Sequence, residues 1–583
     1  MALSRTLRKS APTKATVRRS QLITTYGTGA ILPVESESFM VTGLEHWSPR
    51  DEHRIDEPRL CRLLGVDRLY SPPGGEGASK VPMVRFPEWV SCPICHRLDK
   101  FWRLADKVNG DYVNKCRHCV TPRLVPSRFV ACCPAGHIQD FPYRYWTHRG
   151  TVSADDSEHS LRIHTDPSDS SLAGITVNCT CGAVRSLEGA LGSGAIGLRC
   201  GGNSPWLDKL RDECSESLVG LQRGASNVWF ADVRSALTVD RNLTAAEELL
   251  ERILPELEGV PDTDLAVLLG IKARQHGVDA DELVAAYRRQ SDKPRDFAQG
   301  SKDLRAAEYE ALGRLHPDGA DKTFVCVPER NSTEVGPAVG LVELVSRVTR
   351  LREVRVLSGF ARVSAGPESA SNPFGALSRK RAGWLPAIEV LGEGVFVRIR
   401  EDALKAWEET DFAQDRIGVL TTAIHAAAPQ GARGPAVSVR FLVLHTLAHT
   451  LMRELVLDTG YPASSIRERI YAEPQQSGVL LYTATADAAG SLGGLCSHGS
   501  MKNISRIMES ATESAQWCSA DPVCLESVST GAGATNLAAC HSCLLAPEVS
   551  CEWQNRYLDR ASLVGLETTS GDGLLTGAWP ANP

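Results

Sequence analysis

The alternation of apolar and polar residues predicts strands in two parts of the chain. Near its start, apolar runs at 21–25 and 30–32 are separated by glycines, which indicates strands joined by turns. Residues 320–436 alternate again, as in Val354–Leu357 and Val395–Ile399, with the period of two that is typical of half-buried strands. We therefore expect β-structure in both regions.

The stretch from about 243 to 315 has the spacing of helices instead. Thr244-Ala-Ala-Glu247 is a capping box, and leucine or isoleucine follows it every three or four residues. The pattern predicts two further helices over 262–271 and 281–290, and a polar loop over 291–303. A small helical insertion accounts for this stretch.

The C-terminal part begins with a segment that is apolar on nearly every face. It runs from Val439 to Leu457 and is followed by Gly460, which predicts a buried helix that ends at a glycine. Ser465-Ile-Arg-Glu468 has the form of a cap for another helix, and residues 478–482 are typical of a strand. This succession indicates an α/β domain.

Composition and charge exclude several classes of protein. Hydrophobic residues make up 42% of the chain and charged residues 23%, which are values of a globular protein and not of a disordered or fibrous one. No apolar run approaches the roughly 20 residues that span a bilayer. The net charge of −6 argues against a chain that coats nucleic acid through its overall field, but it leaves room for a local basic groove.

The chain has 18 cysteines, and their chemistry depends on the compartment. The first twenty residues are basic, but no apolar segment follows them, so a secretion signal is not indicated. We therefore expect a cytoplasmic protein. In that reducing environment, closely spaced cysteines are more often metal ligands than disulfides.

The strongest metal signal is the pair of motifs Cys92-Pro-Ile-Cys95 and Cys116-Arg-His-Cys119. Each C-x-x-C turns two thiolates toward one ion, and two such pairs supply the four ligands of a closed structural zinc site. A subdomain built in this way folds only with its metal. Four protein ligands leave no position for water, so we expect this zinc to stabilise the fold and not to catalyse.

A second group of ligand residues is looser. It contains Cys133, His137, Cys179, Cys181 and Cys200, four of which could hold a zinc ion. Either the four cysteines form the site, or His137 replaces one of the thiolates. The C-x-C spacing of the middle pair is tighter than usual, so the ligand set stays open.

A third group lies near the C-terminus. Cys540 and Cys543 form a C-x-x-C, Cys551 follows eight positions later, and Cys518 or Cys524 would be the fourth ligand of a compact zinc knuckle. The sequence thus predicts two to three structural zinc ions. Four other cysteines have no partner at ligand spacing and are expected to be buried thiols: Cys61, Cys214, Cys326 and Cys496.

These patterns predict a mixed α/β protein of several domains. At about 150 residues per domain, the 583 residues correspond to three or four hydrophobic cores. The expected regions are an N-terminal β-rich region at 1–85, a zinc-binding region at 86–215, a helical insertion at 216–319, a mixed α/β region at 320–436 and a C-terminal domain with a zinc cluster at 437–583.

Candidate catalytic residues are few. His445 and His449 stand four apart on the predicted buried helix, as in the zinc-protease motif H-E-x-x-H, but Thr446 follows the first histidine where that motif has its general base. We therefore favour two core histidines, bonded to nearby polar groups, over a metal pair. The glycines of residues 490–494 are not followed by lysine, and no G-x-x-x-x-G-K-[ST] motif for ATP hydrolysis occurs. We expect a protein that is not an enzyme.

Basic residues gather in the 320–436 region and could contact phosphates if they share one face. A solvated charged face would account for them equally well. The residues are Arg352, Arg355, Arg379, Lys380 and Arg381.

Motifs scattered over nearly the whole chain form a recognisable set. They are Arg19-Ser-Gln-Leu-Ile-Thr-Thr-Tyr-Gly-Thr-Gly-Ala30, Gly43-Leu-Glu-His-Trp47, Cys133-Pro-Ala-Gly-His-Ile-Gln-Asp-Phe-Pro142, Trp384-Leu-Pro-Ala-Ile-Glu-Val390 and Cys540-His-Ser-Cys-Leu-Leu545. As a set they resemble the DrmB family, the helicase-associated subunits of the DISARM bacterial anti-phage system. The part from His445 to Arg560 is similar to a helicase-associated C-terminal domain of several superfamily 2 helicases.

The resemblance implies a cytoplasmic subunit that has no motor of its own and works in a complex with a DrmA-like DNA helicase, where it helps to bind or guide DNA. It also implies a four-cysteine zinc cluster where Cys540, Cys543 and Cys551 match, with Cys518 or Cys524 as the fourth ligand.

Two alternative functions stay open. One is a zinc-dependent hydrolase or nuclease that uses His445, His449 and a carboxylate such as Asp487. The other is a stand-alone zinc-ribbon adaptor, which would bind nucleic acid without a helicase.

Overall fold

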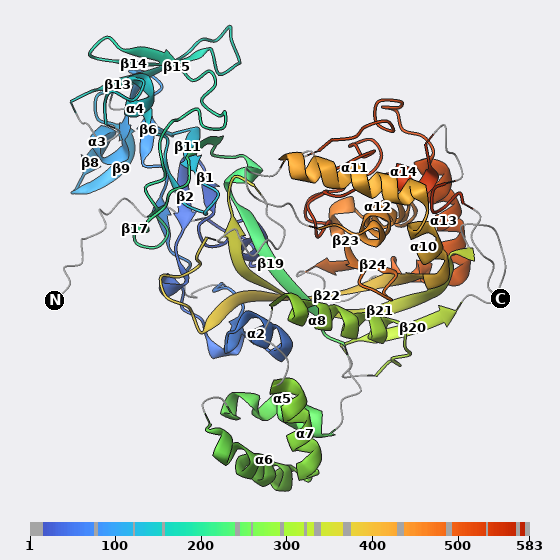
Figure 1. Ribbon diagram of the computed structural model, residues 1–583. Coiled ribbons are helices and arrows are strands. Elements are labelled where there is room, and N and C mark those ends of the chain that lie inside the picture. The colour runs from blue at the N-terminus through green and yellow to red at the C-terminus, as the bar shows by residue number, and fades with distance from the viewer. Residues whose placement is uncertain are drawn as a thin grey trace. The chain divides into compact units, whose positions relative to one another are not determined.

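The computed structural model describes residues 15–74, 80–119, 123–153, 158–239, 245–257, 260–291, 297–319, 323–330, 340–364, 375–427, 436–485, 493–531, 535–566 and 572–577. The chain forms two compact units (Figure 1). Unit 1 comprises residues 1–56, 68–234 and 355–388, and unit 2 comprises 57–67, 235–354 and 389–583. The chain therefore passes from one unit to the other several times, and neither unit is one continuous stretch of sequence.

Most strands of unit 1 lie in small antiparallel sheets, but β3 and β4 belong to the largest sheet, in which β4 pairs in parallel with β22. A six-stranded sheet has the order β10-β6-β7-β13-β14-β15, and two three-stranded sheets have the orders β1-β2-β5 and β12-β11-β18. Two hairpins, β8-β9 and β16-β17, complete them. The strands are β1 (Ile31–Val34), β2 (Glu37–Val41), β3 (Arg54–Ile55), β4 (Arg68–Tyr70), β5 (Met83–Arg85), β6 (Trp89–Ser91), β7 (Arg97–Lys100), β8 (Ala105–Val108), β9 (Asp111–Cys116), β10 (Val125–Pro126), β11 (Phe129–Cys132), β12 (Ile138–Asp140), β13 (Leu161–Thr165), β14 (Ile175–Cys179), β15 (Val184–Ser186), β16 (Asn203–Ser204), β17 (Leu210–Arg211) and β18 (Val219–Gln222).

Short helices connect the strands of unit 1: α1 (Gln21–Thr24), α3 (Phe101–Leu104) and α4 (Tyr143–Thr147). The first of them corrects a prediction, because residues 21–25 form a helical turn and not a strand. In that turn Leu22 and Ile23 are buried, and the Thr24 hydroxyl donates a hydrogen bond to the Ser20 carbonyl. The second apolar run does form a strand, β1, as expected.

The largest sheet has the strand order β19-β21-β22-β24-β23, with β20 beside β21. The ends of unit 1 at Arg234, Arg355 and Ile388 fall within β19, β21 and β22. In unit 2, β24 pairs antiparallel with β22 from Leu391↔Thr485 to Arg398↔Gly478, and with β23 on its other side. The strands are β19 (Phe230–Leu237), β20 (Val325–Arg330), β21 (Val342–Ala361), β22 (Trp384–Ile399), β23 (Ile466–Tyr471) and β24 (Gly478–Thr485).

The central helix of unit 2 is α12 (Val439–Thr459), which lies against β23 and β24. Its first turn is capped by the Ser438 hydroxyl, which accepts from the Phe441 amide at 3.1 Å, and it ends at Gly460 with a φ of +69°. This agrees with the predicted helix and its glycine stop. The buried core joins α12 to the sheet and to α13 (Met501–Ala515).

Other helices of unit 2 are α2 (Pro58–Leu64), α5 (Ala245–Leu257), α6 (Asp262–His276), α7 (Ala280–Ser291), α8 (Phe297–Leu312), α10 (Glu401–Glu408), α11 (Asp411–Ala427) and α14 (Ala561–Val564). The helices α5, α6 and α7 share an aliphatic core that includes Leu249, Leu269 and Leu283, as the periodicity predicts. None of the helices in the described ranges has the length and apolar character needed to cross a bilayer.

Two predictions about unit 2 are wrong. The segment Ser465–Glu468 does not start a helix, because Ile466 begins β23 and pairs with Thr483 of β24. The polar stretch 291–303 is not a loop throughout, because α8 begins at Phe297. In both places long-range packing decides the local structure. The conformational preferences of polar and capping residues are weaker than the stabilisation gained from pairing with a strand or burying a helix face.

Candidate metal centres

Five groups of side chains bring four possible metal ligands together within the described residues. In each group, the sulfur, nitrogen or oxygen atoms lie within 4.8 Å of one another. Unit 1 contains three groups and unit 2 contains two. The groups are Cys92, Cys95, Cys116 and Cys119; Cys133, His137, Cys200 and Cys214; His148, His159, Cys179 and Cys181; Cys518, Cys524, Cys540 and Cys543; and His445, His449, Glu468 and Cys551.

The first group unites the four cysteines of the two C-x-x-C motifs. The sulfur atoms of Cys92 and Cys119 are 3.9 Å apart, and those of Cys95 and Cys116 are 3.8 Å apart. Four sulfurs at about 2.3 Å from a central zinc ion would be ~3.8 Å apart, whereas a disulfide needs about 2.05 Å. The spacing therefore fits a shared zinc ion and not disulfides.

The local fold of the first motif turns its sulfurs inward. Cys92 follows β6, the His96 amide donates to the Cys92 carbonyl at 2.9 Å, and His96 has a φ of +58°. The Cys95 amide points at the Cys92 sulfur at 3.5 Å. Amide hydrogens directed at a sulfur favour its thiolate form, which is the form that binds metal.

The looser second group of the sequence separates into two groups in the structure. Cys133, His137 and Cys200 lie with Cys214, a residue that has no partner at ligand spacing in the sequence. The Cys133 sulfur is 3.5 Å from His137 Nδ1 and 4.0 Å from the Cys214 sulfur. The expected set that combined Cys179 and Cys181 with Cys133 and Cys200 is therefore wrong.

Cys200 has the electrostatics of a metal ligand in this group. The hydrogen bond from the Cys133 thiol, together with His137 and the amide of Gly202, outweighs burial and lowers the pKa of Cys200 to about 4. A thiolate is thus favoured at neutral pH. The sequence signal for its partner Cys214 is weak, because the spacing of fourteen residues matches no common ligand motif.

Cys179 and Cys181 are completed by two histidines that sequence reasoning missed. His159 Nδ1 lies 3.3 Å from the Cys179 sulfur, and His148 Nε2 lies 3.2 Å from the Cys181 sulfur. The other nitrogen of His148 lies 2.8 Å from the Arg144 carbonyl oxygen. A carbonyl in that position holds the proton on Nδ1 and leaves the Nε2 lone pair free for a metal. The tight C-x-C therefore needs only two further ligands.

In the fourth group, Cys518 and Cys524 both join Cys540 and Cys543. The sulfur of Cys540 is 3.5 Å from that of Cys518 and 3.7 Å from that of Cys543, and Cys524 lies 3.7 Å from Cys543. Spacing alone leaves the two upstream cysteines as alternatives for the fourth ligand. They meet because the chain turns back between them, with the Cys524 amide donating to the Ala520 carbonyl at 3.0 Å.

These thiols cannot all ionise without a cation. Burial raises the pKa of Cys540, but the Ser542 amide and the neighbouring thiols lower it to about 7. Burial and the charge on Cys540 then raise the pKa of Cys543 to about 12. Because one thiolate opposes the next, four thiolates at this spacing require a divalent ion between them.

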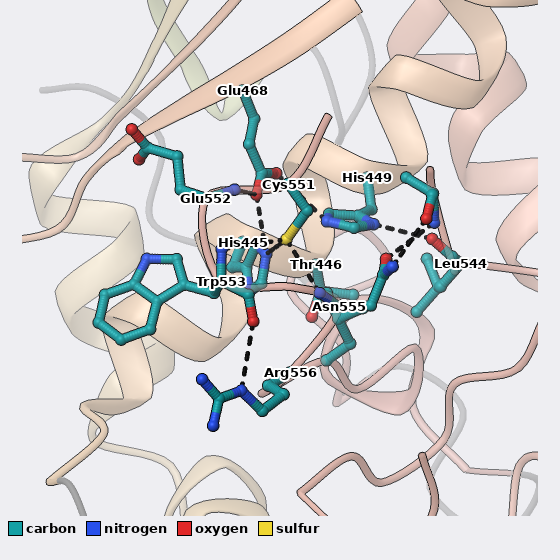
Figure 2. A network of polar contacts seen from close by, with 12 residues as sticks. His445, Thr446, His449, Glu468, Leu544, Cys551, Glu552, Trp553, Asn555 and Arg556 are labelled. Carbon is teal, nitrogen blue, oxygen red and sulfur yellow. Dashed lines mark hydrogen bonds and ion pairs between the residues drawn. The ribbon is translucent and has the colours of Figure 1, made fainter. Parts of the chain in front are cut away.

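Cys551 does not belong to the cysteine knuckle, which corrects that part of the prediction. It lies instead with His445, His449 and Glu468, in a group whose four side chains are all buried (Figure 2). The two histidines are core residues, as expected, but they converge with a carboxylate and a thiol. Asp487, the carboxylate considered for a hydrolase, lies outside the described residues.

The remaining cysteines are mostly buried thiols, as predicted. Burial raises the pKa of Cys326 and of Cys496 to about 12, so both stay protonated. Cys132, next to a ligand of the second group, is buried and has its pKa raised to about 12 in the same way. Cys61 is half-buried.

Two of the basic residues expected to contact phosphates are buried. Arg352 is only 9% exposed, and its guanidinium donates to Glu389 and to the Thr238 hydroxyl, each at 2.7 Å. Arg355 is 6% exposed. The structure therefore contradicts the prediction that these two residues contact phosphates. Both lie in a part of β21 that is buried, whereas phosphate contact requires an exposed side chain.

The other three basic residues lie on the surface. Arg379, Lys380 and Arg381 are exposed in the segment that leads into β22. Arg379 is 3.4 Å from Asp208, and both side chains are about half exposed. An exposed ion pair of this kind is weak, so Arg379 can exchange Asp208 for another anionic partner.

Comparisons with known proteins agree with this geometry. Residues 18–230 match a domain of unknown function, DUF8724, and residues 447–544 match the MrfA Zn-binding domain. The DISARM protein DrmB of Bacillus paralicheniformis is 29% identical over 557 residues, which cover 91% of this chain and 97% of that protein. The description of the first model assigns no function, and that of the second names zinc binding.

The matched regions coincide with the metal groups. The first contains all three groups of unit 1, and the second contains the four cysteines of the knuckle. A four-cysteine group therefore lies in the region that matches a zinc-binding domain.

Proposed function

Because this chain is a homologue of the DISARM protein DrmB, we propose that it is a non-catalytic, zinc-stabilised subunit of a bacterial anti-phage defence complex. In that role it docks on a superfamily 2 DNA helicase, DrmA-like in kind, and helps to bind or guide DNA in the cytoplasm. The partner performs the ATP-driven work.

The observation that supports a non-catalytic role is that the metal groups are closed. Each group brings together four protein ligands, which is the full number for a tetrahedral structural zinc ion. A catalytic zinc normally has three protein ligands and one open position for water or substrate. The four groups rich in cysteine accordingly serve as structural zinc sites.

Contact with DNA is assigned to Arg379, Lys380 and Arg381, which are exposed and adjacent. Phosphate contacts of this kind depend on salt and not on base sequence. A local basic segment also suits a chain with a net charge of −6, since it does not require the whole molecule to attract DNA.

The first experiment tests the partner. The purified chain should hydrolyse no ATP, should co-purify with the helicase of the same defence system, and should change the DNA affinity or ATP turnover of that helicase. An unaltered helicase would contradict the proposal. Tight DNA binding by the chain alone, with no effect on the helicase, would support the stand-alone adaptor instead.

The second experiment tests the basic segment in the complex. Replacing Arg379, Lys380 and Arg381 by glutamate should weaken DNA binding and lower the slope of log affinity against log salt by ~2 to 3, at roughly 0.9 for each phosphate contact. The matched control replaces three other exposed arginines, Arg162, Arg211 and Arg314, with the same change of charge. Equal losses in both variants would show a general effect of charge.

The hydrolase alternative is not favoured by the site. His445 and His449 lie in a fully buried group with two further ligands, which leaves neither an open coordination position nor access for a substrate.

A further inference from the structure

A buried group of four different side chains lies at the centre of unit 2. His445 and His449 come from successive turns of α12, Glu468 comes from β23, and Cys551 comes from the segment after the cysteine knuckle (Figure 2). Their exposed fractions are 0%, 2%, 0% and 4%. Four polar groups without access to water need partners among themselves or a shared ion.

The separations match the edges of a metal tetrahedron. His445 Nε2 lies 3.0 Å from Glu468 Oε1 and 3.2 Å from the Cys551 sulfur, and His449 Nε2 lies 3.3 Å from Glu468 Oε2. Ligands about 2.0 to 2.3 Å from a tetrahedral zinc ion would be ~3.3 to 3.8 Å apart. The group is therefore slightly tighter than, but close to, a zinc coordination shell.

Hydrogen bonding within the group is incomplete. His449 Nε2 and Glu468 Oε2 form an ion pair 3.3 Å apart, yet neither atom makes a hydrogen bond of regular geometry. Buried polar atoms in proteins nearly always have a hydrogen-bond partner. A cation between them would satisfy both atoms at once.

Contacts outside the group orient its ligand atoms. Nδ1 of His449 lies 2.8 Å from the Leu544 carbonyl oxygen, which holds the proton on that nitrogen and directs the lone pair of Nε2 into the group. The Cys551 sulfur accepts hydrogen bonds from the amides of Trp553 at 3.3 Å and Asn555 at 3.2 Å. Both arrangements are those of metal ligands, a neutral imidazole and a thiolate.

We propose that His445, His449, Glu468 and Cys551 form a further, closed metal site that holds Zn²⁺. Two imidazoles, one thiolate and one carboxylate suit a borderline ion such as zinc, whereas Ca²⁺ and Mg²⁺ prefer oxygen ligands alone. The thiolate and the carboxylate balance the two charges of the ion, so the filled site is neutral. That neutrality allows the site to be fully buried.

The ligands of this site come from elements other than the segment that carries the cysteine knuckle. The site joins α12 to β23 and to the segment that carries Cys551. Leu544, whose carbonyl faces His449, directly follows the knuckle ligand Cys543, so the two sites share one stretch of backbone. The region that matches the MrfA Zn-binding domain includes His449 and Glu468 but neither His445 nor Cys551.

The direct test is anomalous X-ray diffraction from crystals of the full wild-type chain above and below the zinc absorption edge. We expect a zinc peak between the four side chains in addition to the peak in the cysteine knuckle. A peak at the knuckle with none at this site would overturn the proposal. A peak that appears only at the edge of another metal would overturn the assignment of zinc.

A variant tests the same site in solution. The double substitution Glu468→Gln and Cys551→Ala removes both anionic ligands and should lower the zinc content by one ion per chain, measured by elemental analysis after dialysis. The control, Thr450→Ala with Cys326→Ala, alters a buried residue of α12 and a buried thiol that belong to no metal group, and it should keep all its zinc. A folded variant with wild-type zinc content would overturn the proposal, and an unfolded one leaves the decision to diffraction.

Discussion

The Cys92 group of unit 1 and the His445 group of unit 2 lie in different surroundings. Around Cys92 and Cys116 the buried cluster is small, and these two ligands are themselves members of it. Around His445 the buried cluster is large and aliphatic, and it joins α12, β23, β24 and α13. In the first region the candidate ligands are part of the core, whereas in the second they lie beside a large aliphatic core.

This difference indicates how much each region depends on its metal. Structural zinc contributes on the order of 10 to 16 kcal/mol in small zinc-binding peptides, and whole domains are stable by only about 5 to 15 kcal/mol. A small cluster of apolar residues therefore cannot replace the ion, but a large aliphatic core can survive its loss. The five predictions below test this comparison, from the largest expected effect to the smallest.

Removing the metal should give the largest difference in amide protection between the two regions. At neutral pH a strong chelator should abolish the amide protection of residues 92–119, because the small core cannot hold that part together alone. The amides of α12 should keep most of their protection. Hydrogen exchange measured by mass spectrometry checks both in one experiment, and loss of protection in both regions at the same chelator concentration would contradict the comparison.

A single ligand substitution should repeat this effect locally. Cys116→Ser should release one zinc ion and cost more than about 4 kcal/mol of local stability, the range typical for loss of a metal. Cys326→Ser is the matched control, since this thiol is equally buried, donates to the Leu312 carbonyl and belongs to no metal group among the described residues, and the substitution should cost about 1 kcal/mol. Zinc content and chemical denaturation distinguish the two, and equal zinc content would show that Cys116 is not a ligand.

In unit 2 a buried ion pair should matter more than any single metal ligand. Arg469 donates two hydrogen bonds of 2.7 Å to the Glu308 carboxylate, and neither side chain is more than 1% exposed. Glu308→Gln should cost about 3 to 5 kcal/mol because it leaves a buried guanidinium with a neutral partner. Chemical denaturation should report this loss in unit 2, while the amide protection of residues 92–119 stays unchanged.

The same pair predicts a pH dependence. Burial raises the pKa of Glu308, but the charges of Arg469 and Arg305 outweigh it, and the folded-state pKa lies below the ordinary value of 4.5. The pair therefore contributes its full stability above about pH 4.5, and this contribution is lost as the pH falls through the folded-state pKa. The Glu308→Gln variant should lack this part of the acid dependence, and parallel pH curves for both proteins would contradict it.

The smallest effect is expected at the start of α12. Ser438→Ala removes the hydroxyl that caps the Phe441 amide and should cost about 1 kcal/mol. Ser500→Ala, which removes the equivalent cap of α13, is the matched comparison with a similar expected loss. Thermal unfolding checks both. A loss of stability as large as that of Glu308→Gln would show that the core of unit 2 tolerates a local substitution less well than we infer.

The sequence predicted those ligands whose partners are close in the chain. Cys92 and Cys95, or Cys540 and Cys543, form turns by themselves, so their spacing alone indicates a metal. Cys214, His148 and His159 gain their role only when separate strands and loops meet, and no local pattern marks them. Glu468 was still harder to predict as a ligand. The segment Ser465–Glu468 resembles a helix cap, but the residue lies on β23.

The fold shows the same division. The helix of residues 439–459 and those of the insertion were predictable, because each carries its own apolar periodicity and end signals. The turn at Gln21–Thr24 and the start of α8 were not predictable, because their state depends on burial against distant residues. Arg352 likewise could not be told from a surface arginine until its partners Glu389 and Thr238 were known.

The repeated passage of the chain between the two units has a consequence for biosynthesis. All ligands of the three groups in unit 1, from Cys92 to Cys214, leave the ribosome before the last segment of that unit, which ends at Ile388. These groups can therefore take up zinc while the unit is still incomplete. By contrast, α2 belongs to unit 2 although it is made among the first residues, and it must wait for residue 235 and beyond before its own unit begins to form. Zinc binding by these groups can thus precede assembly of the largest sheet.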